Sequence, residues 1–145
     1  MATLFRFSEA AALGLHAMVY VAARKGAVVK VREMSAVFRA SEAHMSKVCQ
    51  RLARYGLLIA HRGIHGGFTL GRSAGRIRLL EIYTALEGPV KLSPCLFRNR
   101  SCRDEPKHDC IFGRKIMRFE EEFLSYLRTT SLSSVAATSD LVAAS

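Results

Sequence analysis

Four cysteines are the residues of this sequence best suited to metal binding or redox chemistry, and three of them lie close together. Six residues separate Cys95 from Cys102, and seven separate Cys102 from Cys110. This spacing differs from the paired cysteines of a zinc ribbon and from the cysteine run of a ferredoxin. Three thiols also leave one ligand position of a tetrahedral zinc ion or a cluster unfilled, so a fourth ligand must come from elsewhere.

The surroundings of the cysteines separate these three from the fourth. Basic side chains interleave with the three, and their charge would compensate thiolates. They are Arg98, Arg100, Arg103 and Lys107. Cys49 instead shares a helical stripe with Met45, Val48 and Leu52. We therefore expect Cys49 to be a small core residue and exclude it from any site.

The excess positive charge lies in the N-terminal half of the chain. The net charge is +10, and residues 1–80 hold 13 basic and 3 acidic side chains, whereas residues 81–145 hold 9 of each. Such a surplus indicates a polyanionic partner, either nucleic acid or an anionic membrane surface. The longest apolar run, Ala10 to Ala23, has 14 residues, which is too short to span a bilayer. We expect no membrane partner and, without a recognisable secretory signal, a cytoplasmic location.

Three helices are expected in the N-terminal half. The first covers residues 8–24, with Ser8 as its N-cap, and the second covers Val31 to Phe38. The third begins after Ser41 as N-cap and stops at Gly56, which suits the left-handed position that ends many helices. Its exposed face is polar and basic. That face consists of Lys47, Gln50, Arg51 and Arg54.

The second and third helices, joined by a short turn at Arg39-Ala40, match the helix-turn-helix pattern. Two short strands, Leu57–Ala60 and Gly67–Leu70, follow directly. They flank a glycine-rich segment, residues 62–66, that carries arginine and histidine. A basic hairpin in this place is typical of the wing of a winged helix. The expected fold is therefore mainly α with a small β-hairpin wing.

These elements predict a site for double-stranded DNA. Residues near the start of the third helix would reach base edges in the major groove. They are Ser41, Ala43, His44, Ser46 and Lys47. Arg51 and Arg54 would bind phosphates. On the wing, Arg62, with its neighbours Gly63 and His65, would enter the minor groove or contact the adjoining backbone.

The C-terminal half is expected to contain a helix over 79–87, a polar cysteine-bearing loop, and a long amphipathic helix from about Cys110 to Leu127. A lone exposed helix with such an apolar stripe is unstable in water, so a second copy of the chain is the simplest partner. We expect a DNA-binding domain at 1–78, a cluster-binding loop and dimerisation helix at 79–130, and a partly disordered tail at 131–145.

The chain resembles the Rrf2 family of winged-helix regulators, which includes NsrR, IscR and RirA. The similarity extends over nearly the whole sequence. The segments that carry it are Phe7-Ser8-Glu9, Ala12 to Ala22, Ser41 to Val48, Arg54 to Leu58, Arg62 to Gly67, the three-cysteine loop and the long helix after it. The resemblance implies a homodimeric transcription regulator, a repressor, that holds an iron–sulfur cluster and changes its DNA affinity when the cluster is altered.

The resemblance also implies candidates for the fourth ligand. IscR-like members place a histidine three residues after the third cysteine, where this chain has Gly113. NsrR-like members use an acidic residue in the N-terminal segment, reaching the cluster of the partner subunit, and here that position is Glu9. Competing donors are His108 and His16. A 4Fe–4S cluster is favoured over a 2Fe–2S cluster, with nitric oxide, redox state or iron as the signal.

Two other hypotheses remain open. The same winged helix could be switched by thiol–disulfide chemistry among the three cysteines, or by zinc, without a cluster. Alternatively, the long helix could pair with a different protein in a module that does not bind DNA. An enzyme is not expected, because the sequence shows neither a nucleophile–base pair nor a phosphate-cradling glycine loop beyond the wing.

Overall fold

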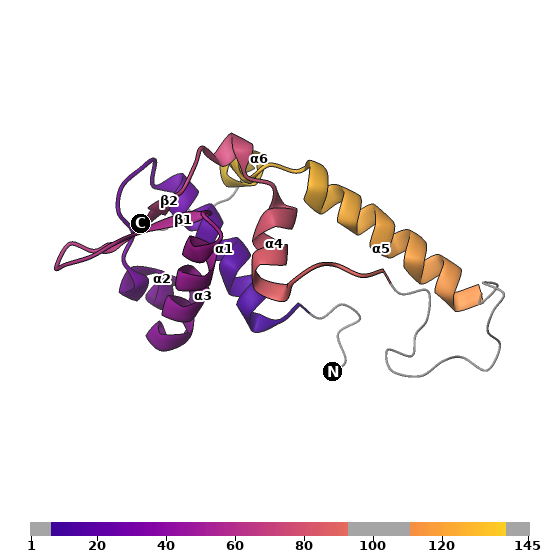
Figure 1. Cartoon of the computed structure of the whole chain (residues 1–145), viewed down its shortest axis with the longest axis horizontal. Helices are drawn as coiled ribbons and strands as arrows, with labels where there is room; N and C mark the ends of the chain where they lie inside the picture. The colour runs from indigo at the N-terminus through magenta and orange to yellow at the C-terminus, as the bar shows by residue number, and fades with distance from the viewer. Residues whose placement is uncertain (1–6, 93–110, 139–145) are drawn as a thin grey trace.

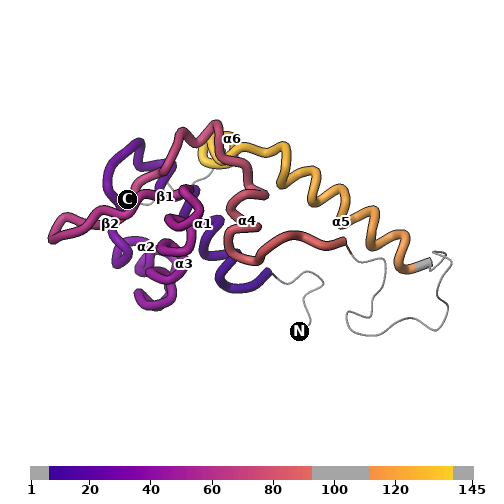
Figure 2. Tube along the Cα trace, viewed as in Figure 1, coloured from indigo at the N-terminus to yellow at the C-terminus, as the bar shows by residue number. Residues whose placement is uncertain are grey.

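The computed structural model describes residues 7–92 and 111–138. These residues form a helical head with a two-stranded hairpin on one side and a long helix on the other (Figures 1 and 2). The elements are α1 (Glu9–Ala23), α2 (Val31–Phe38), α3 (Glu42–Arg54), β1 (Leu58–His61), β2 (Gly67–Leu70), the short 3-10 helix η1 (Ala74–Arg76), α4 (Leu79–Glu87), α5 (Ile111–Thr129) and α6 (Leu132–Thr138). This order confirms the predicted winged helix-turn-helix with a long C-terminal helix.

Helix α1 is the centre of the head. It begins where Ser8 Oγ accepts a hydrogen bond from the N–H of Ala11 at 3.0 Å, which confirms the predicted cap. Helices α3, α4 and α6 all pack against it. Gly14 lies where α4 comes close, because a Cβ at this position would overlap Leu86 Cδ1. A glycine inside this helix is therefore explained by packing, despite its cost in helix propensity.

The helix-turn-helix forms as predicted. Arg39 adopts the left-handed conformation, with φ of 51°, and ends α2. Ser41 Oγ then accepts a hydrogen bond from the N–H of His44 at 3.1 Å and starts α3. The predicted apolar stripe faces the core, and each of its side chains is 3% exposed or less. They are Met45, Val48, Cys49 and Leu52.

The wing is an antiparallel hairpin whose base is tied to the head. Leu58 of β1 lies opposite Leu70 of β2. β1 starts one residue later than predicted, because the N–H of Leu57 still bonds back to α3. Val29, in the connection between α1 and α2, bridges Phe68 through reciprocal hydrogen bonds of 2.9 and 2.8 Å. Beyond this anchor the hairpin extends away from the helices (Figure 2).

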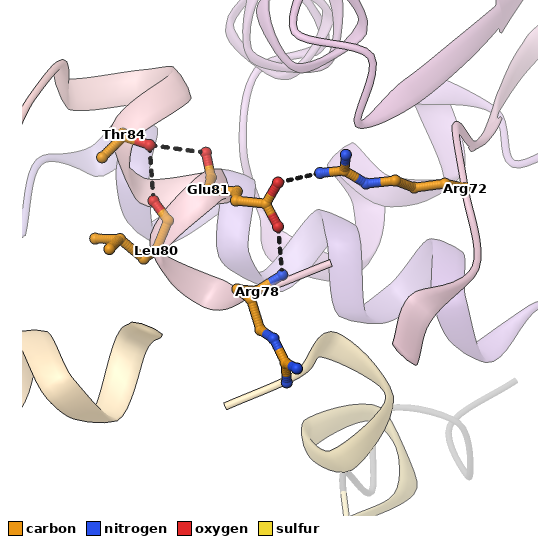
Figure 3. Close-up of polar contacts among 5 residues, drawn as sticks. All are labelled: Arg72, Arg78, Leu80, Glu81 and Thr84. Carbon is orange, nitrogen blue, oxygen red and sulfur yellow. Dashed lines mark hydrogen bonds and ion pairs between the residues drawn. The ribbon is translucent and has the colours of Figure 1, made fainter. Parts of the chain in front are cut away.

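The start of α4 is held by arginine–carboxylate contacts. Glu81 accepts a hydrogen bond from the N–H of Arg78 at 2.8 Å and pairs with the guanidinium of Arg72 (Figure 3). The guanidinium of Arg78 donates to the carbonyl of Thr129, at the end of α5, at 3.1 Å. Two of the basic residues counted in residues 1–80, Arg72 and Arg78, therefore make contacts around α4 and lie outside the helix-turn-helix.

Helix α5 confirms the predicted long helix, whereas α6 was not predicted. Leu132 is fully buried, and its N–H donates to the carbonyl of Ile77 at 2.8 Å. A helix as short as α6 is unstable alone, so its packing on α1 and η1 must stabilise it. The expected tail thus contains ordered helix up to Thr138, and residues 139–145 lie outside the described part. None of the described helices could cross a membrane.

Candidate nucleic-acid interface and metal ligands

The start of α3 presents the side chains that the sequence assigned to base contacts. Ala43 and Lys47 are exposed, and His44 and Ser46 are half-buried. The hydroxyl of Ser41 accepts the capping hydrogen bond, and its own proton remains available to donate to a ligand. Ser46 accepts a hydrogen bond from the side chain of Gln50 at 3.1 Å. This end of the helix therefore offers hydroxyl and ammonium donors, which a surface for phosphates and base acceptors requires, beside the exposed carboxylate of Glu42.

The two arginines predicted to bind phosphates differ in their surroundings. Both are exposed. The Nε of Arg51 donates to the backbone carbonyl of Ala85 in α4 at 2.8 Å and so joins α3 to α4. Arg54 instead lines an open groove between α3 and the wing. Phosphate binding stays a prediction for both, and Arg51 has a packing role that the sequence did not indicate.

The groove beside Arg54 separates the recognition helix from the wing. It has a volume of about 640 Å³. Its lining is formed by Gln50, Ala53, Arg54, Gly56, Leu58, Ile59 and Ala60. In a winged helix with α3 in one groove of DNA and the hairpin in the next, the strand between the two grooves must run past this surface. Arg54 is one of the residues that line it.

The tip of the wing is exposed. Arg62, Gly63 and His65, the three predicted wing contacts, are all exposed. Gly63 has φ of 95°, in the region that favours glycine, and its carbonyl accepts a hydrogen bond from the N–H of Gly66 at 2.9 Å. This bond closes a tight turn and fixes the direction of the tip.

Of the predicted metal ligands, the structure describes Glu9. Its side chain is 74% exposed, and its carboxylate lies 3.7 Å from Nδ1 of His44. The carboxylate is thus accessible from solvent while it lies beside the start of α3. Cys95, Cys102 and Cys110 lie outside the described residues. Within residues 7–92 and 111–138, no three His, Cys, Asp or Glu side chains gather closely enough to hold a metal ion.

Of the two histidines named as competing donors, the structure describes one. His16 is described, and its Nδ1 lies 2.7 Å from the carbonyl of Ala12, one helical turn earlier. Its ring also packs edge-on against Phe38. Those contacts hold the His16 ring on its own helix, with Nε2 as the remaining nitrogen for a ligand. His108 lies outside the described residues.

Cys49 has the surroundings of a core residue. Its side chain is fully buried, and burial raises the pKa of its thiol to about 12. Because the thiolate is the form that binds metals and attacks disulfides, this cysteine is chemically inert in the folded chain. The structure therefore confirms that Cys49 belongs to the core.

An aromatic cluster next to Glu9 was missed by the sequence analysis. The ring of Phe7 packs edge-on against Tyr83 of α4 and Phe123 of α5, with both centroid distances at 5.7 Å. The side chain of Ser8 also donates to Glu87 at the end of α4. The entry to α1 is thus attached to α4 and α5. An aromatic residue before a helix cap was the available signal, but its partners could not be read from the sequence.

Comparison with known proteins gives a consistent assignment. The Rrf2 family model, described as "Iron-dependent Transcriptional regulator", matches residues 7–138. A protein of Aquifex aeolicus assigned as an HTH-type transcriptional regulator is 24% identical over 126 residues, which cover 87% of this chain and 88% of the relative.

Solved structures share the fold. CymR (YrzC), the global cysteine regulator of B. subtilis, superposes with a TM-score of 0.73 at 24% identity, covering 94% of this chain and 100% of CymR. IscR of T. potens superposes with a TM-score of 0.69 at 19% identity, covering 92% of this chain and 88% of IscR. At these identities the two structures establish the fold.

Proposed function

The chain belongs to the Rrf2 family of transcriptional regulators, and on this premise we propose that it is a homodimeric repressor that binds double-stranded DNA through α3 and the wing. One observation carries this proposal. Exposed Lys47 near the start of α3, Arg54 and Arg62 on the wing all present positive charge, and Arg54 lines the open groove between α3 and the wing. This arrangement complements a duplex, with α3 in the major groove and the hairpin in the minor groove.

Binding to DNA is tested with the full-length protein and a library of random duplexes. We expect repeated selection to enrich a sequence with two half-sites about 34 Å apart, one helical turn, because a two-fold dimer presents two α3 helices. The affinity for this duplex should fall steeply with salt, because phosphate contacts release counterions. A library that stays random after selection would contradict the proposal.

Dimerisation is assigned to α5. Several of its aromatic side chains are exposed to solvent, among them Phe112 at 65% and Tyr126 at 50%. A second copy of the same helix would cover them, which supports a homodimer. Sedimentation equilibrium measures the oligomeric state directly. A chain that stays monomeric at concentrations at which it binds the selected duplex would contradict this part of the proposal.

The proposed regulator of DNA affinity is an iron–sulfur cluster. The ligands are Cys95, Cys102 and Cys110, with Glu9 of the partner subunit as the fourth. Three thiols among basic side chains and an exposed carboxylate fit such a group, of the 4Fe–4S or 2Fe–2S type. When bound, it would supply iron that is sensitive to nitric oxide, oxygen or iron supply.

In this proposal the described residues position the N-terminal segment relative to α3, α4 and α5. Because the carboxylate of Glu9 lies 3.7 Å from Nδ1 of His44, any group that holds Glu9 bears on the orientation of His44 at the start of α3. Phe7 and Ser8, on either side of the cap, attach the same segment to α4 and α5. The N-terminal segment is thus placed between the cysteine-bearing half and the DNA-reading helix.

The cluster is tested on protein purified without oxygen. We expect iron and acid-labile sulfide in the purified dimer, with visible absorbance, and a non-denaturing mass spectrum gives the number of iron and sulfur atoms. Colourless protein that contains zinc, or that forms disulfides among the three cysteines on oxidation, would favour the alternative switch. The Cys49→Ser variant is the matched control, because this buried thiol should not affect iron content.

A further inference from the structure

The wing tip carries an isoleucine in a place where an apolar side chain gains nothing from the fold. Ile64 is 88% exposed, the largest exposed fraction among the large apolar side chains in the described part of the chain. Single exposed apolar residues are common on protein surfaces, so exposure alone carries no argument. The argument rests on how the turn is built and on what surrounds its tip.

The turn holds Ile64 outward on a fixed support. The carbonyl of Gly63 accepts the N–H of Gly66 at 2.9 Å, so Ile64 and His65 occupy the two corner positions of a four-residue turn. Gly66 leaves no room for a side chain, because a Cβ there would overlap the carbonyl of His61. Turn corners favour Gly, Pro, Asn, Asp and Ser, so a β-branched residue is contrary to local preference. Such a local conflict is expected at a functional position.

The chemistry around the tip indicates what Ile64 contacts. Exposed Arg62 and His65 flank it, and residues 58–70 contain no Asp or Glu. The hairpin therefore suits a polyanion, whereas its tip is apolar. The minor groove of DNA combines these properties, because its potential is negative and its deoxyribose walls are apolar. Both walls approach an inserted side chain most closely where the groove is narrow, as in A·T-rich sequences.

We propose that Ile64 inserts into the minor groove, contacts the deoxyribose walls, and makes the wing select narrow, A·T-rich sites. This inference rests on the proposed DNA binding and adds a determinant of specificity to it. Arg62 supplies positive charge in the same groove, and the side chain of Ile64 contacts both walls only where the groove is narrow.

The test compares Ile64→Ala with the wild type on the duplex selected by the wild-type protein. Fluorescence anisotropy at several salt concentrations should show affinity about tenfold weaker, because three apolar carbons lose their contacts. The salt dependence should be unchanged, because no phosphate contact is lost. Arg62→Ala should instead reduce the salt dependence. Val90→Ala is the control, because it trims a 38% exposed β-branched side chain in the segment after α4, outside α3, the wing and the groove between them, and it should stay within twofold of the wild type.

A second arm changes the DNA. Base pairs contacted by the wing, located by hydroxyl-radical footprinting, are replaced by G·C, whose amino group lies in the minor groove, or by inosine·C, which lacks it. Wild type should lose affinity only with G·C, and Ile64→Ala should discriminate less. Ile64→Ala binding within twofold of wild type, or equal losses of both proteins on G·C, would overturn the inference while DNA binding stands. A wild-type protein that enriches no duplex would overturn the proposed function and this inference together.

Discussion

The DNA-reading end and the cysteine-bearing end of this molecule are stabilised in different ways. At the reading end, α2, α3 and the wing are fixed by contacts within one chain: a capped α3, a buried stripe, and a hairpin tied to Val29. At the other end, α5 extends from the head (Figure 1), and several of its aromatic side chains are exposed. The comparison indicates that contacts within one chain fix the reading end, whereas α5 leaves aromatic side chains exposed, which on the proposed function a second copy would cover.

The N-terminal segment connects the two ends. Phe7 contacts α4 and α5, and Glu9 contacts His44 of α3, within three residues of sequence. On the proposed function, these contacts give a change at the cysteine-bearing end a short path to α3. If the two ends are separable in this way, substitutions should affect one property and leave the other intact.

The largest effect is expected from Cys102→Ala. Removal of one of three thiol ligands should abolish the visible absorbance and the iron content, because a carboxylate and two thiols hold a cluster poorly. Helical content should be unchanged, because the head is stabilised by its own core. Circular dichroism and iron analysis of protein purified without oxygen measure both. Retention of full iron content in this variant would remove Cys102 from the ligand set.

The next effect concerns α6, which joins the C-terminal part of the chain to the head. Leu132→Ala should lower the free energy of unfolding by about 2–5 kcal/mol, because Leu132 is fully buried. Ser133→Ala, at an exposed position of the same helix, should change it by about 0.5 kcal/mol or less. Urea denaturation followed by circular dichroism measures both variants. Equal stabilities of the two would mean that α6 does not contribute to the core in solution.

The sequence predicted the reading end closely, because local signals determine it. Helix α2 has the predicted bounds and ends at the left-handed residue Arg39; outside the reading end, α4 also has the predicted bounds and ends before Gly88, whose φ is 85°. Cys49 was placed in the core by its helical spacing alone. These features need only neighbours within one or two turns of helix, and patterns of that length can be read from a single sequence.

The remaining features depend on distant partners. α6 has few large apolar residues, and its packing on α1 comes from more than a hundred residues away in sequence. Of the arginines on the basic face of α3, Arg51 donates to the carbonyl of Ala85 in α4, and nothing in the local pattern distinguishes it from Arg54. The contact between Glu9 and His44 joins two separate helices. In each case tertiary packing decides among side chains that the local pattern treats as equivalent.

A smaller effect should separate Arg54 from Arg51. Arg54→Gln should reduce the slope of log affinity against log salt by about 2, because a dimer loses two phosphate contacts. Arg51→Gln should reduce the slope less, and it should lower the free energy of unfolding by about 1 kcal/mol, because the bond from its Nε to Ala85 is lost. Anisotropy titrations and urea denaturation measure these quantities. An equal fall in slope for the two variants would mean that the bond to Ala85 does not limit phosphate binding by Arg51.

The smallest effect concerns Cys49 and its pH dependence. Burial raises the pKa of this thiol to about 12, above its value in the unfolded chain. The resulting stabilisation is complete below the unfolded pKa, near 9, and is lost as the pH rises toward 12. Between pH 8 and 9.5 the free energy of unfolding of the wild type should therefore fall relative to that of Cys49→Ala, which lacks the thiol, by less than about 1 kcal/mol. Other titrating groups cancel in this comparison, so a constant difference between the two proteins across that range would show that the thiol is not buried. Iodoacetamide should also leave Cys49 unmodified at pH 8 until urea unfolds the chain, because both its protonation and its burial in the reading end prevent attack.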